Sequence, residues 1–393
     1  MLTLLLRQCI VVGAVLALAL PLRAGAAPGG PYVPPPGEWA TRTPAEAGFD
    51  PEKLAAAVAF AQDSETPITE KTEDAIRFFL LREPHNEIIG PVKDRGGQNG
   101  ILLRDGYIVA EWGDTRRVDM TFSVTKSYLS TMAGLAWDDG LIRALHDPVR
   151  DYVRDGGFDS AHNREITWHM LLNQTSGWQG TLWGKPDWAD RYTGERPPAH
   201  PPGTHWRYND VRVNRLALAL LQVWRRPLPQ VLRARIMDPI GASPTWRWHG
   251  YENSWVVIDG QRMQSVAGGA HWGGGMFIST RDHARFALLY LRRGNWGGVQ
   301  LLSEAWVERA LTPTPQEPTY GYMNWLPNTG RGRYASAPET SFFAHGAGSN
   351  VFWCDPQHRI VAVLRWMRED RVDDFIARVL GALAAGGGNR PVR

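Results

Sequence analysis

Apolar residues spaced three and four positions apart mark the helices that this sequence predicts. Asp50, Pro51 and Glu52 supply a capping residue, a proline at the first helical position and an acidic first turn, and they open the run LAAAVAFAQ. A second long run is YLSTMAGLAWDDGL, and residues 130–240 consist mainly of helical patterns broken by proline and glycine. Two more helices are expected at about 281–293 and in the last apolar segment, DDFIARVLGALAA.

Strand patterns occur on both sides of this helical middle. The stretch GILLRDGYIVAEWG places two β-rich runs around residues 104–106, which is a hairpin signal. Near the C-terminus, GGGMFIST leads into a helix, and the runs FFAHGAGSNVFWC and RIVAVLRW flank residues 355–358 as a second hairpin. The pattern therefore predicts strands at both ends of the chain and helices between them.

This order indicates an α/β (α+β) fold with one antiparallel sheet built from N- and C-terminal segments, flanking helices and an inserted helical domain. Within residues 44–390 we expect an α/β part at 44–122 and 266–390 and a mainly helical part at 123–265. A catalytic site would lie in the cleft between the two parts.

The first residues carry the pattern of a signal peptide. Residues 1–26 contain Arg7, the apolar run IVVGAVLALALPL and an A-x-A cleavage pattern that ends at Ala26. We expect cleavage after Ala26 and an exported, periplasmic or secreted protein with no stable membrane span; the alternative is an uncleaved N-terminal anchor. Residues 27–43 are a lead-in rich in proline and glycine that cannot form a helix or a central strand.

Composition narrows the function classes. The chain has 393 residues, of which 43% are hydrophobic and 21% charged, as in a globular protein. Removing Arg7 and Arg23 with the signal reduces 43 basic residues to 41, against 40 acidic ones, so nothing indicates a nucleic-acid partner. The same cut leaves Cys354 as the one cysteine, which excludes an intramolecular disulfide in the mature chain.

The stretch Ser-Val-Thr-Lys at 123–126 is the first candidate for chemistry. A helix that begins at or near Ser123 places Lys126 one turn on, on the same face. A serine hydroxyl is a weak nucleophile, and an adjacent, partly desolvated amine can act as its base. With 14 serines and five lysines in the chain, roughly 0.2 accidental Ser-x-x-Lys matches are expected. In the alternative interpretation, Ser123 caps the helix and Lys126 is a surface charge.

A second candidate is the stretch PPGTHWRYND at 201–210. A Pro-Gly turn and a short extended piece deliver Tyr208 directly before an apolar-periodic helix, for which Asn209 and Asp210 are good capping residues. A phenol held there could exchange a proton with a nucleophile or leaving group if cations lower its pKa. The alternative is a packed core tyrosine.

The third candidate is AHGAGSN at 344–350. Glycines in a strand mark close approach by another backbone or a ligand, and here they would expose amides beside His345. The amide of Ser123 and an amide near Gly348 could then form an oxyanion hole. The alternative is a structural bulge with a surface histidine.

In this order the three segments resemble the serine β-lactamase and penicillin-binding-protein superfamily, especially the branch of class C β-lactamases, related esterases and nylon-oligomer hydrolases. The resemblance extends from about Ala45 to the last helix. The motif at 123–126 matches the serine motif by its position, the Pro-Gly turn before Tyr208 looks like the tyrosine motif, and residues 345–348 stand where β-lactamases carry Lys-Thr-Gly.

Two departures bear on the site. The family pattern is Tyr-x-Asn, whereas residues 208–210 read Tyr-Asn-Asp; an aspartate at 210 could pair with Lys126 and favour its charged form. Literal Tyr-x-Asn matches at 251–253 and 322–324 rank lower, because neither follows a Pro-Gly turn nor opens a long apolar helix. His345 replaces a lysine that would hold a substrate carboxylate. No zinc helix or phosphate loop is present, so we expect no metal and no cofactor.

The resulting hypothesis is acyl transfer to water. Ser123 attacks an ester or amide carbonyl, Lys126 and Tyr208 move its proton to the leaving group, and the amides of Ser123 and a residue near Gly348 hold the oxyanion. His345 would contact the substrate or tune Tyr208 electrostatically. The partner would be a small-molecule ester or amide without an essential carboxylate, and the sequence does not indicate an oligomeric state.

Three alternatives stay open. One is a D-amino peptidase or β-lactamase that acts on cell-wall peptides or β-lactams. Another is a catalytically decayed binding or sensor protein of the same fold. A carbohydrate-binding module would explain the 18 tryptophans but not the serine and lysine.

Overall fold

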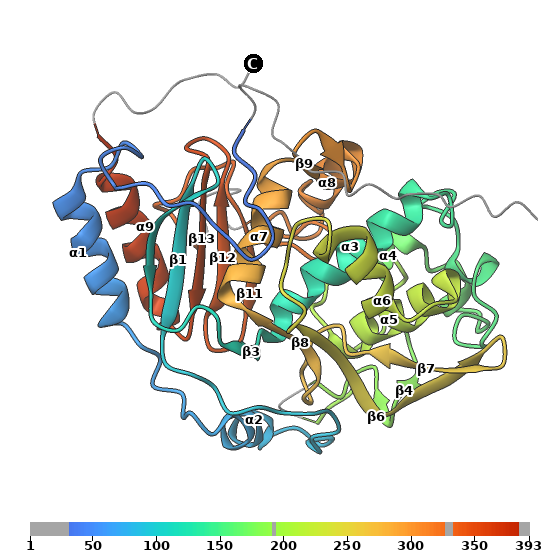
Figure 1. Cartoon of the computed structure of the whole chain (residues 1–393). Coiled ribbons are helices and arrows are strands. Elements are labelled where there is room, and N and C mark those ends of the chain that lie inside the picture. Colours follow the sequence, from blue (N-terminus) through green and yellow to red (C-terminus); the bar gives the residue numbers. More distant parts are fainter. Residues whose placement is uncertain (1–30, 191–193, 327–332, 385–393) are drawn as a thin grey trace, which may run out of the picture.

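An antiparallel sheet of five strands forms one half of the molecule (Figure 1). The computed structural model describes residues 31–190, 194–326 and 333–384, so the predicted signal peptide lies outside the described residues. The sheet joins both ends of the chain, as predicted, because the first hairpin pairs with the last strand. In sheet order the strands are β11 (Phe342–Gly346), β12 (Asn350–Asp355), β13 (Ile360–Arg365), β1 (Asn99–Arg104) and β2 (Tyr107–Trp112).

Helices cover both faces of this sheet. α1 and α9 lie side by side against one face and α7 against the other (Figure 1). Alternation along β1 sends Leu102 into the core under α1 and α9, and Ile101 and Leu103 into the larger core around α3, α5 and α7. The helices described are α1 (Pro51–Gln62), α2 (Thr72–Leu80), α3 (Thr125–Asp138), α4 (Trp168–Leu172), α5 (Asp210–Trp224), α6 (Leu228–Leu232), α7 (Thr280–Leu291), α8 (Glu304–Ala310) and α9 (Val372–Gly381).

The predicted capped start of the first helix is confirmed. The side chain of Asp50 accepts hydrogen bonds from the amides of Glu52 and Lys53 at the start of α1.

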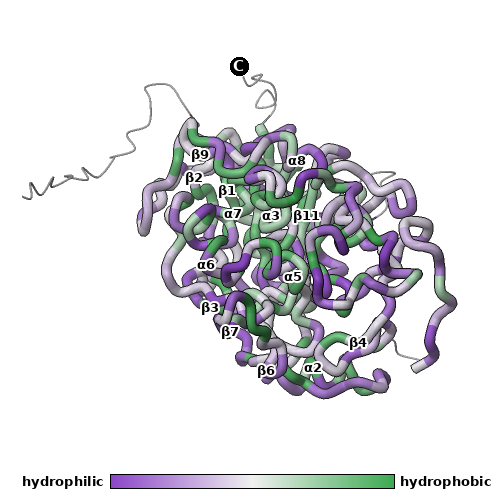
Figure 2. The backbone as a smooth tube through the Cα atoms, turned by 90° about the vertical axis from the view of Figure 1, so that its right-hand side faces the viewer, coloured by the Kyte–Doolittle hydropathy of each residue, from purple (hydrophilic) through white to green (hydrophobic). Residues whose placement is uncertain are grey.

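The hydrophobic residues gather on the inner strands and on α3, while many hydrophilic residues lie on the outer loops (Figure 2). Among the described residues, no helix is both long and apolar enough to cross a membrane.

The lead-in has no regular helix or strand over its described part, residues 31–43, apart from an isolated bridge between Thr41 and Ile108. Arg285 of α7 fastens it to the core, since its guanidinium donates to the carbonyl oxygens of Pro34, Pro35 and Glu38.

A second sheet has the order β3 (Val118–Met120), β8 (Gly275–Ser279), β6 (Arg247–Ile258) and β7 (Gln261–Val266), all antiparallel. Two of its strands, β6 and β7, come from the end of the part of the chain that was predicted to be mainly helical, and two strands, β3 and β8, come from the predicted α/β part. The long strand β6 is irregular, because its register with β7 shifts between Gly250 and Trp255. This irregularity interrupts the two-residue alternation by which a strand is identified. Short two-residue pairs complete the strands: β4 (Thr181–Leu182), β5 (Lys185–Pro186), β9 (Asn295–Trp296) and β10 (Val299–Gln300).

The C-terminal run FFAHGAGSNVFWC forms two strands instead of one. β11 ends at Gly346 and β12 begins at Asn350, with a tight turn between them in which Gly348 and Ser349 have positive φ. The predicted hairpin at 355–358 follows between β12 and β13.

A buried arginine joins the two sheets. Arg365 at the end of β13 donates to the carbonyl oxygens of Met120 in β3 and Ile278 in β8, at 2.7 and 3.1 Å, and to the side chain of Asn350 at 2.5 Å. These bonds fix the end of β3, three residues before Ser123, against the central sheet.

Candidate active site

Ser123 lies in a single 3-10 turn between β3 and α3. The turn spans Phe122–Val124, and Phe122 has φ of 47°, in the left-handed region that a bulky side chain seldom adopts. Such backbone strain persists only where the surroundings impose it, and it is frequent at functional sites. The ring of Phe122 meets that of Trp366 edge-on, with centroids 6.2 Å apart.

Lys126 is placed beside the serine as the sequence predicted. It lies in the first turn of α3, and its Nζ is 3.0 Å from Ser123 Oγ and 2.7 Å from Asp210 Oδ1. The Lys126 side chain is only 1% exposed. The interpretation of Lys126 as a surface charge is therefore wrong, and the amine reaches the hydroxyl directly.

Tyr208 lies on the other side of the lysine. Lys126 Nζ is 4.5 Å from the centre of its ring, and the ring stacks on Trp325. Burial, with the charge of Asp210, raises the pKa of Tyr208 well above its usual value, and a hydrogen bond with Ser123 only partly opposes this. The shift is opposite to the one that a phenolate base needs, so this phenol keeps its proton near neutral pH.

The two residues after Tyr208, both predicted to support the site, make different contacts. Asn209 caps α5 with its side-chain oxygen, and its side-chain amide donates to Asp187 O and Asp190 Oδ1, so both ends of this side chain are bonded to residues other than Lys126. Asp210 makes the predicted pair with Lys126. Burial disfavours a charge on Asp210, but Lys126 and His271 together hold the pKa of its carboxyl below the usual value.

Behind Asp210 lies a group of ionisable residues that no motif in the sequence indicated. His271 Nδ1 is 3.6 Å from Asp210 Oδ2, and His271 Nε2 is 2.9 Å from both carboxylate oxygens of Glu83. Asp190 accepts a hydrogen bond from the Asp210 amide, and burial raises its pKa to about 6. The one sequence feature that sets His271 apart from the other histidines is its place in the glycine-rich run AGGAHWGGG.

The end of strand β11 approaches Ser123 closely, as the glycines of residues 344–350 predicted. A Cβ on Gly346 would lie 2.3 Å from Thr121 O and 3.1 Å from Ser123 N, so only glycine fits there. Ala347 and Gly348 follow in the turn and line the same cavity as Ser123. The backbone of Gly346 is thus close to the serine amide, and the next two residues border the cavity into which Ser123 opens.

His345 occupies a different place from the one expected. It is not among the described residues that line the cavity, and its Nε2 is 3.5 Å from Arg333 and 3.8 Å from Glu369. Burial and the charge of Arg333 lower the pKa of His345 to about 3, which keeps the imidazole neutral. His345 therefore supplies no cation in place of the family's lysine.

Ser123 opens into a cavity of about 930 Å³. Glu83, Asp190, Asp210 and His271 supply ionisable groups to its lining, and α2 with the segment before it supplies most of the apolar ones. The lining residues are Pro67, Ile68, Thr69, Thr72, Asp74, Ala75, Ile76, Phe78, Phe79, Glu83, Phe122, Ser123, Asp190, Tyr208, Asp210, Gly269, Ala270, His271, Ala347, Gly348 and Trp366.

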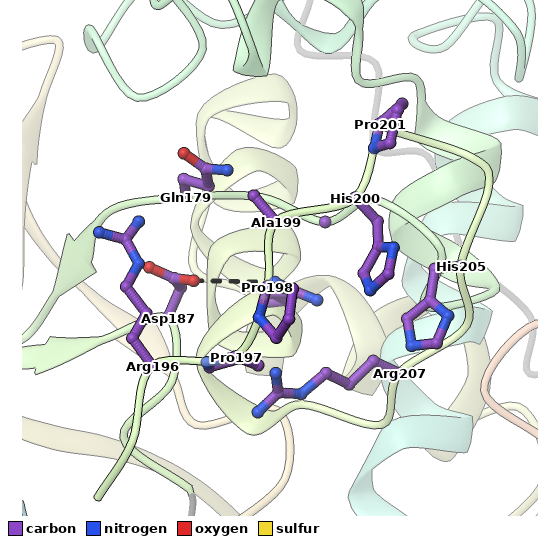
Figure 3. Close-up of a pocket in the computed structure, with 12 residues that line it drawn as sticks. Gln179, Asp187, Arg196, Pro197, Pro198, Ala199, His200, Pro201, His205 and Arg207 are labelled. Atoms are coloured by element: carbon purple, nitrogen blue, oxygen red, sulfur yellow. Dashed lines mark ion pairs between the residues drawn. The ribbon is translucent and has the colours of Figure 1, made fainter.

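A second, smaller hollow of about 270 Å³ lies outside this site (Figure 3). Arg196, Arg207 and the stacked rings of His200 and His205 surround it, and an ion pair of 3.7 Å joins Asp187 to Arg212. Of the residues that the structure describes, none lines both this hollow and the cavity at Ser123.

The tyrosines of the two literal Tyr-x-Asn matches form hydrogen bonds with residues outside the predicted site. Tyr251 accepts a hydrogen bond from Asn214, and Tyr322 bonds to His169. The segment 171–177 supports the site, because Gln174 binds both the Asn209 amide and the Tyr320 hydroxyl. Over the described ranges, no three histidine, cysteine, aspartate or glutamate side chains are grouped as a metal site.

The match with known proteins covers most of the chain. The family model described as Beta-lactamase matches residues 104–386. Among solved structures, the chain is similar to a beta-lactamase from Mycobacterium bovis, with 20% identity, a TM-score of 0.54 and coverage of 75% of this chain and 97% of that one. It is also similar to EstCE1, a hydrolase with promiscuous acyltransferase activity, with 15% identity, a TM-score of 0.53 and coverage of 85% of this chain and 99% of that one.

A penicillin-binding protein homologue from Caulobacter crescentus is similar in the same way, with 15% identity, a TM-score of 0.54 and coverage of 81% and 99%. At these identities the structural likeness shows the fold alone. No curated protein matches the chain.

Gly269 provides a test of how tightly the ion pair is enclosed. A Cβ there would lie 1.5 Å from Asp210 Oδ1 and 2.4 Å from Lys126 Nζ. Gly269→Ala should therefore lower the free energy of unfolding by about 1–3 kcal/mol, measured by urea titration. Gly97→Ala is the matched control, because a Cβ at Gly97 meets nothing within 4 Å. Equal stability of the two variants would contradict the packing described here.

Proposed function

The chain belongs to the beta-lactamase family, and from this premise we propose that it is an exported serine hydrolase that acts on small esters or amides through an acyl-enzyme. The observation that carries the proposal is the buried amine of Lys126, 3.0 Å from the hydroxyl of Ser123 at the edge of a large cavity. A nucleophile within hydrogen-bond reach of a base is the arrangement that covalent catalysis needs.

The reaction would run in two halves. Ser123 Oγ attacks the carbonyl carbon while neutral Lys126 takes its proton. The Tyr208 phenol donates its proton to the leaving alcohol or amine as the bond to carbon breaks, and the proton held by Lys126 then restores the phenol. In the second half, water attacks the acyl-serine and gives its proton to Lys126, which returns it to Ser123 Oγ as the acid departs. The Ser123 amide and an amide of the adjacent turn, at Gly348, would hold the negative oxygen in both halves.

The charges of the cavity favour neutral substrates. Among the described residues, the carboxylates of Asp74, Glu83, Asp190 and Asp210 line it beside the single imidazole of His271, whereas no described lysine or arginine does. A substrate carboxylate would meet this acidic lining without the cation that the family's lysine supplies, since His345 is neutral. Ile68, Ile76, Phe79, Phe122 and Trp366 offer apolar surface to an acyl or aryl group.

The same lining ranks the alternatives. Cell-wall peptides and β-lactams carry a carboxylate, so their hydrolysis is the second choice. A decayed binding protein would have no need to keep Ser123, Lys126 and Tyr208 in mutual contact.

The proposed division of the chain agrees with where the lining residues originate. Ile68 and Phe79 come from residues 44–122, Tyr208 from 123–265 and Gly348 from 266–390. We also propose export, on the signal pattern of residues 1–26.

Labelling of the serine tests the proposal directly. A fluorophosphonate should add one covalent adduct to the mature protein, and Ser123→Ala should abolish it, as read by intact mass. Ser160→Ala is the control, since Ser160 is exposed and outside the cavity, and it should label fully. Labelling that survives in Ser123→Ala would sink the assignment of the nucleophile.

Substrate charge gives a second test. At pH 8 the kcat/KM for a neutral p-nitrophenyl butyrate should exceed that for the p-nitrophenyl monoester of succinate by about tenfold or more, because carboxylates in the cavity repel the second ester. The ratio should narrow as pH falls through about 6, where Asp190 gains its proton. Asp190→Asn should remove this pH dependence. A preference for the succinate ester would contradict the proposed substrate class.

A further inference from the structure

Four buried groups of alternating charge lie in a row behind the serine. Glu83 contacts His271, His271 contacts Asp210, and Asp210 contacts Lys126, with separations of 2.9, 3.6 and 2.7 Å. All four side chains are at most 11% exposed. Alternation leaves none of these charges uncompensated, which is the condition for burying them.

We propose that His271, anchored by Glu83, is a positioning residue that holds Asp210 and offsets its charge so that Lys126 can release its proton and act as the base. The inference rests on the proposed function, because it concerns the base of that reaction. It assigns roles to Glu83 and His271, which no motif in the sequence indicated.

The need for such a residue follows from the aspartate at 210. A carboxylate 2.7 Å from an ammonium stabilises the charged lysine, whereas a base must be neutral when the serine gives up its proton. The imidazolium of His271 faces the other oxygen of the same carboxylate. It attracts Asp210 and repels the positive charge on Lys126, so both effects ease the loss of the lysine proton to solvent.

The surroundings of His271 favour its charged form. Three carboxylates act on it: Glu83 from the segment after α2, Asp210 from the start of α5, and Asp190 from the segment after β5. The rings of Phe79 and Trp272 pack against the imidazole edge-on. Burial opposes the charge, but the hydrogen bonds to Glu83 and the three carboxylates outweigh it and raise the pKa of His271.

The pH profile of kcat/KM tests the inference, with p-nitrophenyl butyrate as the substrate. His271→Gln keeps a side chain of similar size but removes the positive charge, so Lys126 should hold its proton more firmly. The acidic limb should move to higher pH by roughly one unit, with activity recovered on the alkaline plateau. His249→Gln is the matched control, since His249 is half-buried and outside the cavity, and its limb should stay in place.

Asp210→Asn adds a second arm. This variant should move the limb to lower pH, because it removes the carboxylate that stabilises the ammonium. His271→Gln should then have a smaller effect in the Asp210→Asn background, since Asp210 is one of the carboxylates that keep His271 charged. Thermal unfolding of each variant separates a loss of folded protein from a change in the profile.

The outcomes are distinct. A uniform fall in activity at every pH, with an unmoved limb, would show that His271 only packs and would overturn the inference. If Ser123→Ala hydrolyses the ester as fast as the wild type, the proposed function itself fails. If Ser123→Ala is inactive and the His271→Gln limb stays in place, the inference alone fails.

Discussion

The buried ion pair between Lys126 and Asp210 is the interaction on which the site depends. Taking both charges out of water is costly, and losing one partner would leave the other charged and unpaired, at a cost of about 3–5 kcal/mol. The fold meets this constraint from several directions: α3 supplies the lysine, α5 begins with the aspartate, and Gly269 leaves room for both. His271 completes the pair by facing the second oxygen of the carboxylate.

The rest of the architecture brings this pair to a reactive hydroxyl. Arg365 binds the end of β3 to the central sheet, and this holds in place the start of the strained turn that carries Ser123. Gly346 at the end of β11 lets that strand approach the serine amide, and Tyr208 lies on the far side of Lys126 within a cluster of aromatic rings. The family membership and the antiparallel core explain the overall fold, and these contacts are the ones on which the proposed chemistry depends.

Much of this could be predicted from sequence, because the signals were local. The spacing of Ser123 and Lys126 and the capped helix after Tyr208 each follow from a few neighbouring residues, and the pair with Asp210 follows from charge alone. Glu83 and His271 could not be predicted, since 188 positions separate them and only the folded chain brings them together. From its position in the sequence, His345 was expected to contact the substrate or tune Tyr208. In the structure it contacts Arg333 instead, and burial together with the charge of Arg333 keeps its imidazole neutral. The second sheet escaped prediction because β6 carries a register shift.

The central claim is that hydrolysis passes through an acyl group on Ser123. The most direct measurement is acid quenching of the enzyme during turnover of a chromogenic ester, followed by tryptic mapping. Cleavage after Arg117 and Lys126 releases residues 118–126, in which Ser123 is the one serine. We predict the mass of the acyl group on this peptide and its disappearance as the substrate is exhausted. Continued hydrolysis with the acyl group on another peptide would contradict the account.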